Sequence, residues 1–316
     1  MLVSDQKPVV IIIGPTASGK SALALDLAGE FAGTVINADS MQVYQELRVL
    51  TARPSAVDEA KAPHKLFGVL AAAETCSVGR WVKMAQAEIE AAWGAGRLPI
   101  VVGGTGLYIK VLTEGLAPVP DVPDAVNDEV RARFELIGGE AFKDELANLD
   151  PGAAASLPTG DRQRLERAMA VIRATGKPLS EWRGMQPPGP AIDARFLTIQ
   201  LLPGREELYA GTEARFDKMM ETGALDEVKA LLALDLDPSL PAMKAVGVPE
   251  LGRYLNGEMT LEDAVSAAKQ ATRNFAKRQL TWMRNQVEAD VVIEAPYGKA
   301  HHGDIVAAVG VFLPRG

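Results

Sequence analysis

The hydrophobic pattern of the first hundred residues alternates short apolar runs with longer amphipathic stretches. The runs at 9–13 and 99–102 are bounded by Gly, Pro or charged residues, which is typical of buried parallel strands. Residues 33–39 are expected to form another strand. Apolar residues at helical spacing predict helices over 20–31 and 77–96. This alternation predicts an α/β fold with a parallel sheet core covered by helices on both faces.

The pattern breaks between two proline-rich stretches at 116–124 and 183–193. The segment between them lacks a clear apolar strand, and its apolar residues follow a helical spacing. A strand pattern resumes at 195–203, so we expect an inserted all-helical domain with stiff borders. A continuous second domain from residue 118 onward is the alternative. The expected bounds are 118–193 for the insertion and 1–117 with 194–316 for the P-loop core.

The cysteine and histidine counts, the length of the apolar runs and the net charge exclude several classes of protein. The single cysteine excludes a disulfide framework and fits a reducing cytoplasm. Three histidines and one cysteine provide no zinc set. No apolar run approaches the roughly 18 residues of a membrane span. The net charge of −8 argues against a uniformly basic nucleic-acid binder, but it leaves room for local basic patches.

The sequence GPTASGKS at 14–21 fits the phosphate-binding pattern G-x-x-x-x-G-K-[ST]. It follows an apolar strand and opens a helix, so backbone N–H groups and the helix N-terminus can hold phosphate oxygens. Lys20 adds a charge, and the Ser21 hydroxyl is a candidate Mg²⁺ ligand. A glycine-rich turn with a chance lysine is the alternative. The loop residues predicted to bind a diphosphate are Gly14, Thr16, Ala17, Ser18, Gly19, Lys20 and Ser21.

A nucleotide-hydrolysing protein with such a loop needs a further buried strand that ends in Asp. Here the strand at 99–102 ends instead in the sequence GGTG at 103–106, where glycines allow close approach of a ligand and Thr105 offers a hydroxyl. Asp39, at the end of strand 33–39, is either a base and candidate metal ligand or a helix N-cap. These features favour a reaction in which a diphosphate leaves and Asp39 deprotonates a nucleophile other than water.

Two segments, 161–183 and 269–284, are basic within an acidic chain. They indicate a polyanionic partner, and solvated surface helices are the alternative. On a helical wheel of the second segment, basic and apolar residues fall on opposite sides. The basic side holds Lys269, Arg273, Lys277 and Arg284, and the apolar side holds Ala264, Ala268, Ala271, Phe275 and Trp282.

Nine sequence blocks, in order along almost the whole chain, resemble those of the tRNA dimethylallyltransferase (tRNA isopentenyltransferase) family of bacterial type. A phosphate loop alone would be unspecific, whereas this ordered set is specific. The blocks are GPTASGKS (14–21), NADSMQVY (37–44), TARPS (51–55), VVGGTGLYI (101–109), DRQRLERA (161–168), TGKPLSEW (175–182), LLPGREEL (201–208), AVGVPEL (245–251) and ATRNFAKRQLTWMRNQ (271–286).

The resemblance implies transfer of a dimethylallyl group from dimethylallyl diphosphate to N6 of an adenine at position 37, next to the tRNA anticodon. It implies Mg²⁺ as cofactor and a channel that donor and flipped base enter from opposite ends. It implies Asp39 as general base, Thr105 as its helper and Arg205 as a diphosphate ligand beside Lys20. A cytoplasmic monomer without zinc or membrane partner is expected.

The resemblance also implies which residues grip the anticodon stem-loop, with the inserted domain as an arm. The family usually has PHHL where this chain has PHKL at 63–66, so Lys65 departs from the pattern. The residues expected to contact tRNA are Asp39, Ser40, Met41, Gln42, Arg131, Gln163, Arg164, Leu165, Glu166, Arg167, Lys244, Gly247, Arg273, Lys277, Arg278, Gln279 and Arg284.

Three other functions are considered. An adenylate (free nucleotide) isopentenyltransferase would use the same site, but it needs neither the inserted domain nor the basic C-terminal helix. A small-molecule P-loop kinase would need the missing strand-end Asp. A regulator with a degenerate loop is disfavoured because Lys20, Ser21 and Asp39 are all present.

Overall fold

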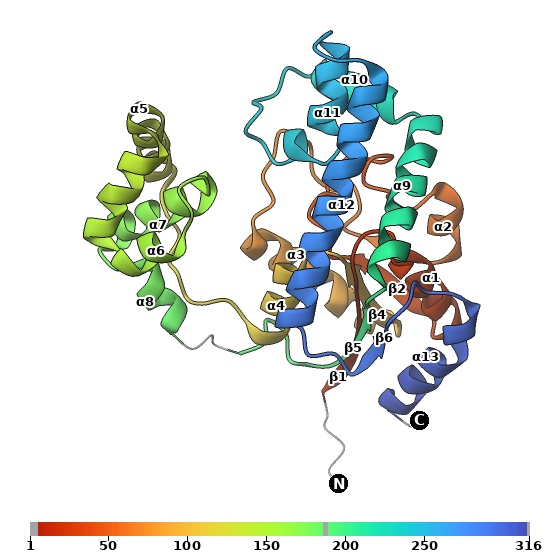
Figure 1. Cartoon of the computed structure of the whole chain (residues 1–316). Coiled ribbons are helices and arrows are strands. Elements are labelled where there is room, and N and C mark those ends of the chain that lie inside the picture. The colour runs from red at the N-terminus through yellow and green to blue at the C-terminus, as the bar shows by residue number, and fades with distance from the viewer. Residues whose placement is uncertain (1–5, 186–188, 315–316) are drawn as a thin grey trace. The chain divides into compact units, whose positions relative to one another are not determined.

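The structure is a computed structural model, and it describes residues 6–185 and 189–314. Within these residues the strands form one six-stranded sheet in the order β3-β2-β4-β1-β5-β6, and every neighbouring pair is parallel (Figure 1). The strands are β1 (Lys7–Ile13), β2 (Gly33–Asn37), β3 (His64–Lys65), β4 (Leu98–Gly103), β5 (Ala194–Leu201) and β6 (Val291–Ile293).

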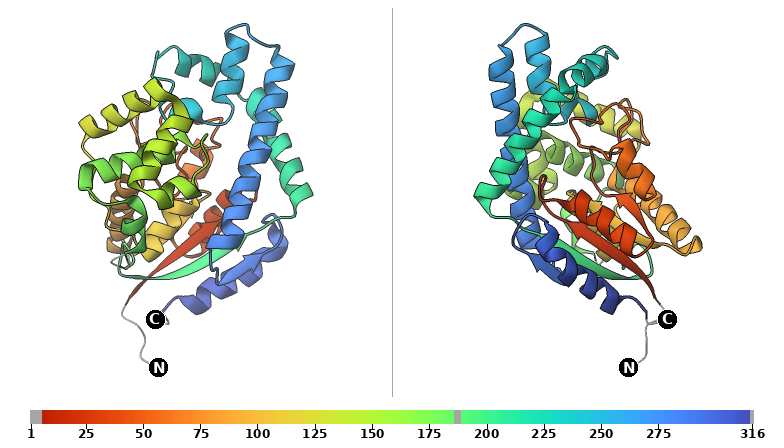
Figure 2. Two further views of the ribbon diagram at one scale, coloured as in Figure 1. Left: turned by 60° about the vertical axis from the view of Figure 1, so that its left-hand side comes forward. Right: turned by 90° about the vertical axis from the view of Figure 1, so that its right-hand side faces the viewer.

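Strand β1 lies inside the sheet, and its apolar run is fully buried. Successive side chains of a strand point to opposite faces, so the run feeds two layers. Val10 and Ile12 pack in one layer with helices α1 and α13, whereas Ile11 and Ile13 face the other layer, which contains α3 and α12 (Figure 2). The helices named here are α1 (Lys20–Glu30), α3 (Val78–Gly94), α12 (Leu261–Gln286) and α13 (Lys299–Phe312).

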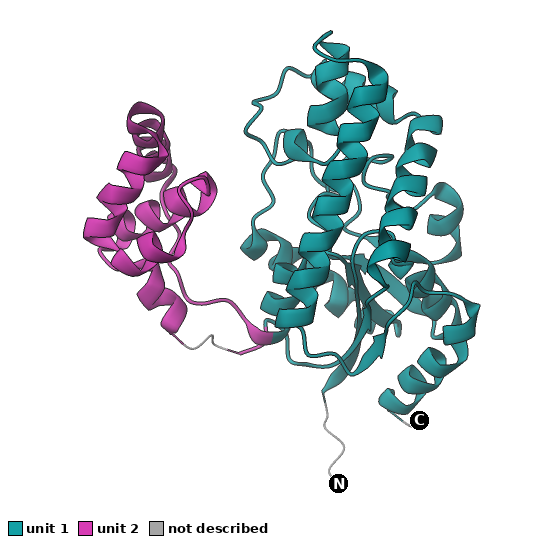
Figure 3. Ribbon diagram, viewed as in Figure 1, with its two compact units in different colours: residues 1–113, 191–316 teal, residues 114–190 magenta. Residues whose placement is uncertain are grey.

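The chain divides into two compact units (Figure 3). Unit 1 comprises residues 1–113 and 191–316, and unit 2 comprises residues 114–190; the borders expected from the sequence were 117/118 and 193/194. Unit 1 holds the sheet and its covering helices. The remaining helices of unit 1 are α2 (Ala56–Lys61), α4 (Gly106–Glu114), α9 (Arg205–Glu221), α10 (Ala224–Leu232), the 3₁₀ turn η1 (Ala242–Lys244) and α11 (Val248–Leu255).

All the regular secondary structure in the described part of unit 2 is helical, and the unit has a core of its own. Phe142 and Leu146 from one helix pack with Leu165 and Met169 from another. The first of these helices changes direction at Gly138, where φ is +74°. The helices of unit 2 are α5 (Asp124–Leu149), α6 (Pro151–Ser156), α7 (Arg162–Thr175) and α8 (Leu179–Gly184).

Several details differ from the sequence expectation. Strand β2 ends at Asn37, so Asp39 lies in the following loop. The short edge strands β3 and β6 were not predicted, because two or three residues carry no periodicity. In α12 the buried face differs from the apolar side that the helical wheel predicted. Ala264 and Ala268 are buried, as are Thr272, Ala276 and Gln279, whereas Ala271, Phe275 and Trp282 are partly exposed.

The shift in α12 has a physical cause. The buried polar side chains form hydrogen bonds inside the fold, which removes the penalty of burying them. The Thr272 hydroxyl donates to the Ala268 carbonyl at 2.8 Å, and the Gln279 amide donates to the Gly104 carbonyl at 3.1 Å. In the part of the chain that the structure describes, helices are too short or too polar to cross a membrane.

Candidate active site

The predicted phosphate loop connects β1 to α1 and is tightly constrained. Gly19 has a φ of +88°, and a Cβ there would lie 2.9 Å from Cβ of Tyr297. The Tyr297 N–H donates to the Ser18 carbonyl at 2.9 Å, so a C-terminal segment supports the loop. The first turn of α1 contains no acidic residue. Its N–H groups and the helix dipole therefore remain available to an anion.

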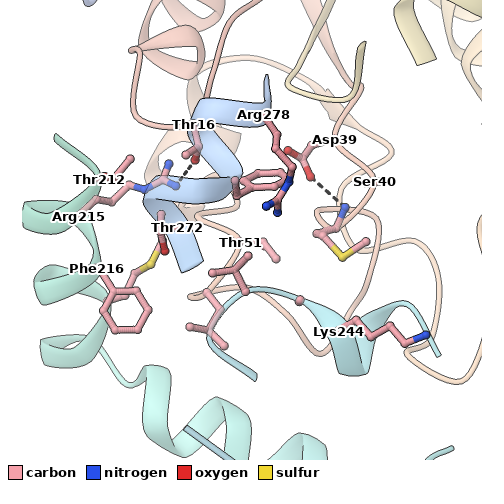
Figure 4. Close-up of a pocket in the computed structure, with 16 residues that line it drawn as sticks. Thr16, Asp39, Ser40, Thr51, Thr212, Arg215, Phe216, Lys244, Thr272 and Arg278 are labelled. Carbon is pink, nitrogen blue, oxygen red and sulfur yellow. Dashed lines mark hydrogen bonds between the residues drawn. The ribbon is translucent and has the colours of Figure 1, made fainter. Parts of the chain in front are cut away.

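Two cations meet at this loop. Lys20 Nζ donates to the Pro15 carbonyl at 2.7 Å, and Arg215, from α9, donates to the hydroxyl of Thr16 (Figure 4). Burial lowers the pKa of Lys20 to about 7; the charge of Asp39 opposes this shift and that of Arg215 adds to it. Burial also lowers the pKa of Arg215. Burial thus disfavours the charged forms of Lys20 and Arg215, and the charge of Asp39 opposes both shifts. Two buried cations side by side are suited to binding a multivalent anion.

The position of Arg205 differs from the expectation. Arg205 is exposed at the start of α9, with its guanidinium 5.3 Å from the ring centroid of Tyr209 and its Nε donating to the Tyr209 hydroxyl at 3.0 Å. The residue of α9 that reaches Lys20 and Thr16 is Arg215, which the sequence reasoning missed. Arg215 lies between the buried residues Thr212 and Phe216 of α9, but no periodic signal in the sequence marked it as a ligand.

Asp39 is held by its neighbours with one carboxylate oxygen bonded. Oδ1 accepts from the Met41 N–H at 2.9 Å, and the Asp39 N–H donates to Oδ1 of Asn37 at 2.8 Å. Residues 40–43 form turns and bends, so the alternative role of Asp39 as a helix N-cap is wrong. Because Asp39 lines the cavities described below, its second oxygen is available to a bound molecule.

Thr105 is coupled to the residue after Asp39. Its hydroxyl accepts from the Ser40 N–H at 3.0 Å and lies 3.3 Å from the Ser40 hydroxyl. Gly103 lines the smaller of the cavities described below, and both neighbouring glycines also have a packing role. A Cβ at Gly103 would lie 2.1 Å from the Ala38 carbonyl oxygen, and a Cβ at Gly104 would lie 2.2 Å from the Gln279 amide. These glycines therefore let the Asp39 loop and α12 pack against β4.

Two adjoining cavities of unit 1 meet at these residues. The smaller, of about 80 Å³, contains Lys20 and Ser21. The larger, of about 270 Å³, has an apolar part formed by Leu50, Phe216 and Met219 (Figure 4). The residues that line both cavities are Thr16, Asp39, Thr51 and Arg215. The arrangement joins an anion-binding end, a carboxylate and an apolar chamber.

The expected tRNA contacts in unit 1 fall into three groups. Ser40, Met41, Lys244 and Arg278 line the larger cavity, and Gln42 lines the smaller one. Lys277 and Arg284 are exposed on α12, whereas Arg273 is paired with Glu213 of α9. Gly247 is buried, with φ at +99°.

Gln279 requires a correction. Its side chain is 8% exposed, and its Oε1 accepts from the Thr16 N–H at 2.8 Å while its Nε2 donates to the Gly104 carbonyl. The amide therefore holds the phosphate loop against β4, with one hydrogen bond accepted and one donated inside the protein. Lys65, at the departure from the family pattern, pairs with Glu88 at 3.7 Å.

In unit 2 the expected contacts are mostly on the surface. Gln163, Arg164 and Arg167 are exposed on α7, whereas Leu165 is fully buried in the helical core and is corrected to a packing residue. Three of the expected contacts form local ion pairs, namely Arg131 with Asp128, Arg164 with Asp161 and Glu166 with Arg162.

The fold and the site define an α/β protein with a candidate anion site between a strand and a helix, and with a carboxylate beside an apolar chamber. Comparison with known proteins adds the family. A family model described as "IPP transferase" matches residues 42–286, and one described as "Isopentenyl transferase" matches residues 7–65. The chain belongs to the IPP transferase family.

Individual relatives agree with this assignment. The tRNA dimethylallyltransferase of Rhodospirillum centenum is 55% identical over 283 residues, which cover 90% of each chain. A crystal structure of a tRNA isopentenylpyrophosphate transferase from Bacillus halodurans is similar at a TM-score of 0.69 and 31% identity, covering 97% of this chain and 98% of that one. A eukaryotic dimethylallyltransferase acting on tRNA is similar at a TM-score of 0.80 and 27% identity, covering 97% of this chain and 78% of that one.

Proposed function

We propose that this protein is a tRNA dimethylallyltransferase. It transfers a dimethylallyl group from dimethylallyl diphosphate to N6 of the adenine at position 37, next to the anticodon, and releases diphosphate. The observation that carries the proposal is the pair of cavities that share Thr16, Asp39 and Arg215, because a proposed anion site and a proposed base then border one space. The named relatives act on tRNA, which supports the choice of acceptor.

The site residues can carry out this transfer with ordinary roles. The N6 lone pair forms a bond to C1 of the dimethylallyl group, and the C1–O bond breaks with its electron pair remaining on the diphosphate. Lys20, Arg215 and the loop N–H groups stabilise that developing charge. The proton lost from N6 passes to Asp39, whose orientation the Met41 N–H fixes.

Magnesium fits this site only together with the diphosphate. Among the described residues, no group of three or more His, Cys, Asp or Glu side chains could hold a metal. The smaller cavity offers the Ser21 hydroxyl and the Asp39 carboxylate, and Mg²⁺ commonly binds through one or two protein groups plus substrate phosphates and water. When bound there, the ion would neutralise charge on the diphosphate. We assign Ser21 rather than Asp39 as the Mg²⁺ ligand, because the proposed reaction uses Asp39 as the base.

The acceptor is an RNA loop. A stacked adenine must leave the stack before its N6 can reach an enclosed carboxylate, and this costs less in a loop than in a duplex. Exposed basic residues of α12, with Arg164 and Arg167 of unit 2, are proposed to bind the phosphates of the anticodon stem-loop. The tRNA substrate and single cysteine support a cytoplasmic location, and we expect the protein to act as a zinc-free monomer.

The experiment supplies labelled dimethylallyl diphosphate with Mg²⁺ and either bulk tRNA or AMP. We expect label in tRNA, at an adenine adjacent to the anticodon, and none in AMP. Labelling of AMP alone would support the adenylate isopentenyltransferase instead. Transfer of phosphate to a small molecule from ATP would support the kinase, although no observation favours it.

A further inference from the structure

A short surface segment, residues 48–52, forms a wall of the active site. Leu50 lines the larger cavity, Ala52 lines the smaller one, and Thr51 lines both. The segment turns sharply: the Ala52 N–H donates to the Val49 carbonyl at 3.0 Å, and Ala52 has a φ of +53°. A residue other than glycine seldom adopts this conformation without support from its surroundings.

That support comes from a carboxylate distant in sequence. Glu227, in the first turn of α10, accepts hydrogen bonds from three consecutive backbone N–H groups. Its Oε2 lies 2.7 Å from the Arg48 nitrogen and 2.6 Å from the Val49 nitrogen, and its Oε1 lies 2.9 Å from the Leu50 nitrogen. Hydrogen bonds to an ionised acceptor are about twice as strong as neutral ones. Both carboxylate oxygens are thus used to fix one side of the segment.

Other contacts hold the far side of the segment but do not replace Glu227. The Gln42 amide donates to the Thr51 carbonyl at 2.7 Å. Leu50 packs closely on Gly247, where an added Cβ would lie 2.7 Å from Leu50 Cδ2. Neither contact supplies an acceptor for the N–H groups of residues 48–50. If Glu227 is removed, these N–H groups lose their bonds and the wall is free to move.

We propose that Glu227 is a positioning residue for the transfer reaction. It contacts no substrate; it acts through Leu50 and Thr51, whose placement shapes the space around Asp39 and Arg215. The proposal rests on the proposed function, because it concerns how the same site orders its reactants. A displacement of about 1 Å among reacting groups can lower a rate by roughly 10²-fold.

The test compares Glu227→Gln with Asp226→Asn. Both substitutions remove one negative charge from the first turn of α10, but Asp226 is exposed and the hydrogen bonds of residues 48–50 go to Glu227. A glutamine presents one oxygen and one N–H₂ group, so it cannot accept at both positions. For Glu227→Gln we expect kcat with dimethylallyl diphosphate and tRNA to fall about 10- to 100-fold. Asp226→Asn should match the wild type.

Two further readouts separate positioning from general damage. The affinity of Glu227→Gln for inorganic diphosphate should fall much less than kcat, because the proposed diphosphate ligands Thr16, Lys20 and Arg215 belong to other elements than the wall. With Leu50 no longer fixed, discrimination against geranyl diphosphate should weaken. Equal kcat in the two variants, or a parallel loss of diphosphate affinity and kcat, would overturn the proposal.

A measurement on the wild type tests the proposal even if the Glu227→Gln variant fails to fold. Amide hydrogen exchange at residues 48–50 should be slow, because all three N–H groups are bonded to one carboxylate. Exchange as fast as that of an open loop would contradict the hydrogen bonds from residues 48–50 to Glu227. Wild-type turnover in the same assay tests the proposed function independently of either variant.

Discussion

At the scale of single residues, Asp39 is the proposed general base. Asp39→Asn keeps the acceptor for the Met41 N–H but removes the base. We expect the single-turnover rate to fall about 10²–10⁴-fold, the range for loss of a general base. Affinity for tRNA, measured by filter binding, should change little. A variant that reacts at nearly the wild-type rate would remove Asp39 from the role of base.

Arg215 and Arg205 provide a matched pair on one helix. Arg215 reaches Thr16, whereas Arg205 lies exposed against Tyr209. A charged hydrogen bond contributes about 1.5–3 kcal/mol, so Arg215→Ala should weaken diphosphate binding roughly 10- to 100-fold. Arg205→Ala should leave it nearly unchanged. Isothermal titration with inorganic diphosphate measures both, and the reverse order would restore Arg205 as the ligand.

At the scale of elements, the end of β4 packs directly against the loop that carries Asp39. A Cβ at Gly103 would lie 2.1 Å from the Ala38 oxygen and 2.2 Å from its carbonyl carbon, which are backbone atoms. Gly103→Ala should therefore lower the free energy of unfolding by about 1–3 kcal/mol and reduce kcat as well, since Ala38 precedes Asp39.

The control for Gly103 lies in α3. A Cβ at Gly94 would meet no atom within 4 Å, so Gly94→Ala should be neutral or stabilise the fold by up to about 1 kcal/mol. Urea unfolding curves compare the two variants. Equal stabilities would show that β4 and the Asp39 loop can separate without loss.

Tyr108 on α4 stacks against Trp81 on α3, and its buried hydroxyl should make the free energy of unfolding fall at alkaline pH. The ring centroids lie 4.4 Å apart, and burial raises the pKa of Tyr108 above its ordinary value of 10.0. Above pH 10 the unfolded chain releases this proton while the folded chain retains it, so stability falls as pH rises. Chemical unfolding at pH 9 and pH 11 should show a smaller decline for Tyr108→Phe than for the wild type. An equal decline would mean that Tyr108 ionises freely in the folded protein.

The sequence could predict those elements whose signal is local. The apolar run of β1 predicts a buried strand, which the structure has, and the glycine-rich loop after it predicts an anion site, because each signal depends on neighbouring residues alone. Arg215 and Glu227 could not be found in this way. Their roles arise where α9 and α10 meet loops from the first fifty residues, and side chains at such distances carry no periodic signal.

At the scale of the whole molecule, ion pairs revise the basic face expected of α12. Lys269 pairs with Asp217 at 2.6 Å, and Arg273 pairs with Glu213, so α9 neutralises half of that face. Lys277 and Arg284 are exposed, and within the described chain no carboxylate lies within ion-pair distance of them. The surface of α12 that we propose for RNA phosphates therefore lies toward its C-terminal half.

This redistribution of charge predicts how salt should affect tRNA binding. Lys277→Ala and Arg284→Ala should each weaken binding and reduce the slope of log affinity against log salt by up to about one unit, because each would remove one proposed phosphate contact. Arg273→Ala should change the slope less, since its charge is already balanced by Glu213. Diphosphate affinity, measured on the same preparations, should stay constant in all three variants. A slope that falls most for Arg273→Ala would mean that RNA displaces Glu213, whereas three flat slopes would mean that α12 does not meet RNA phosphates.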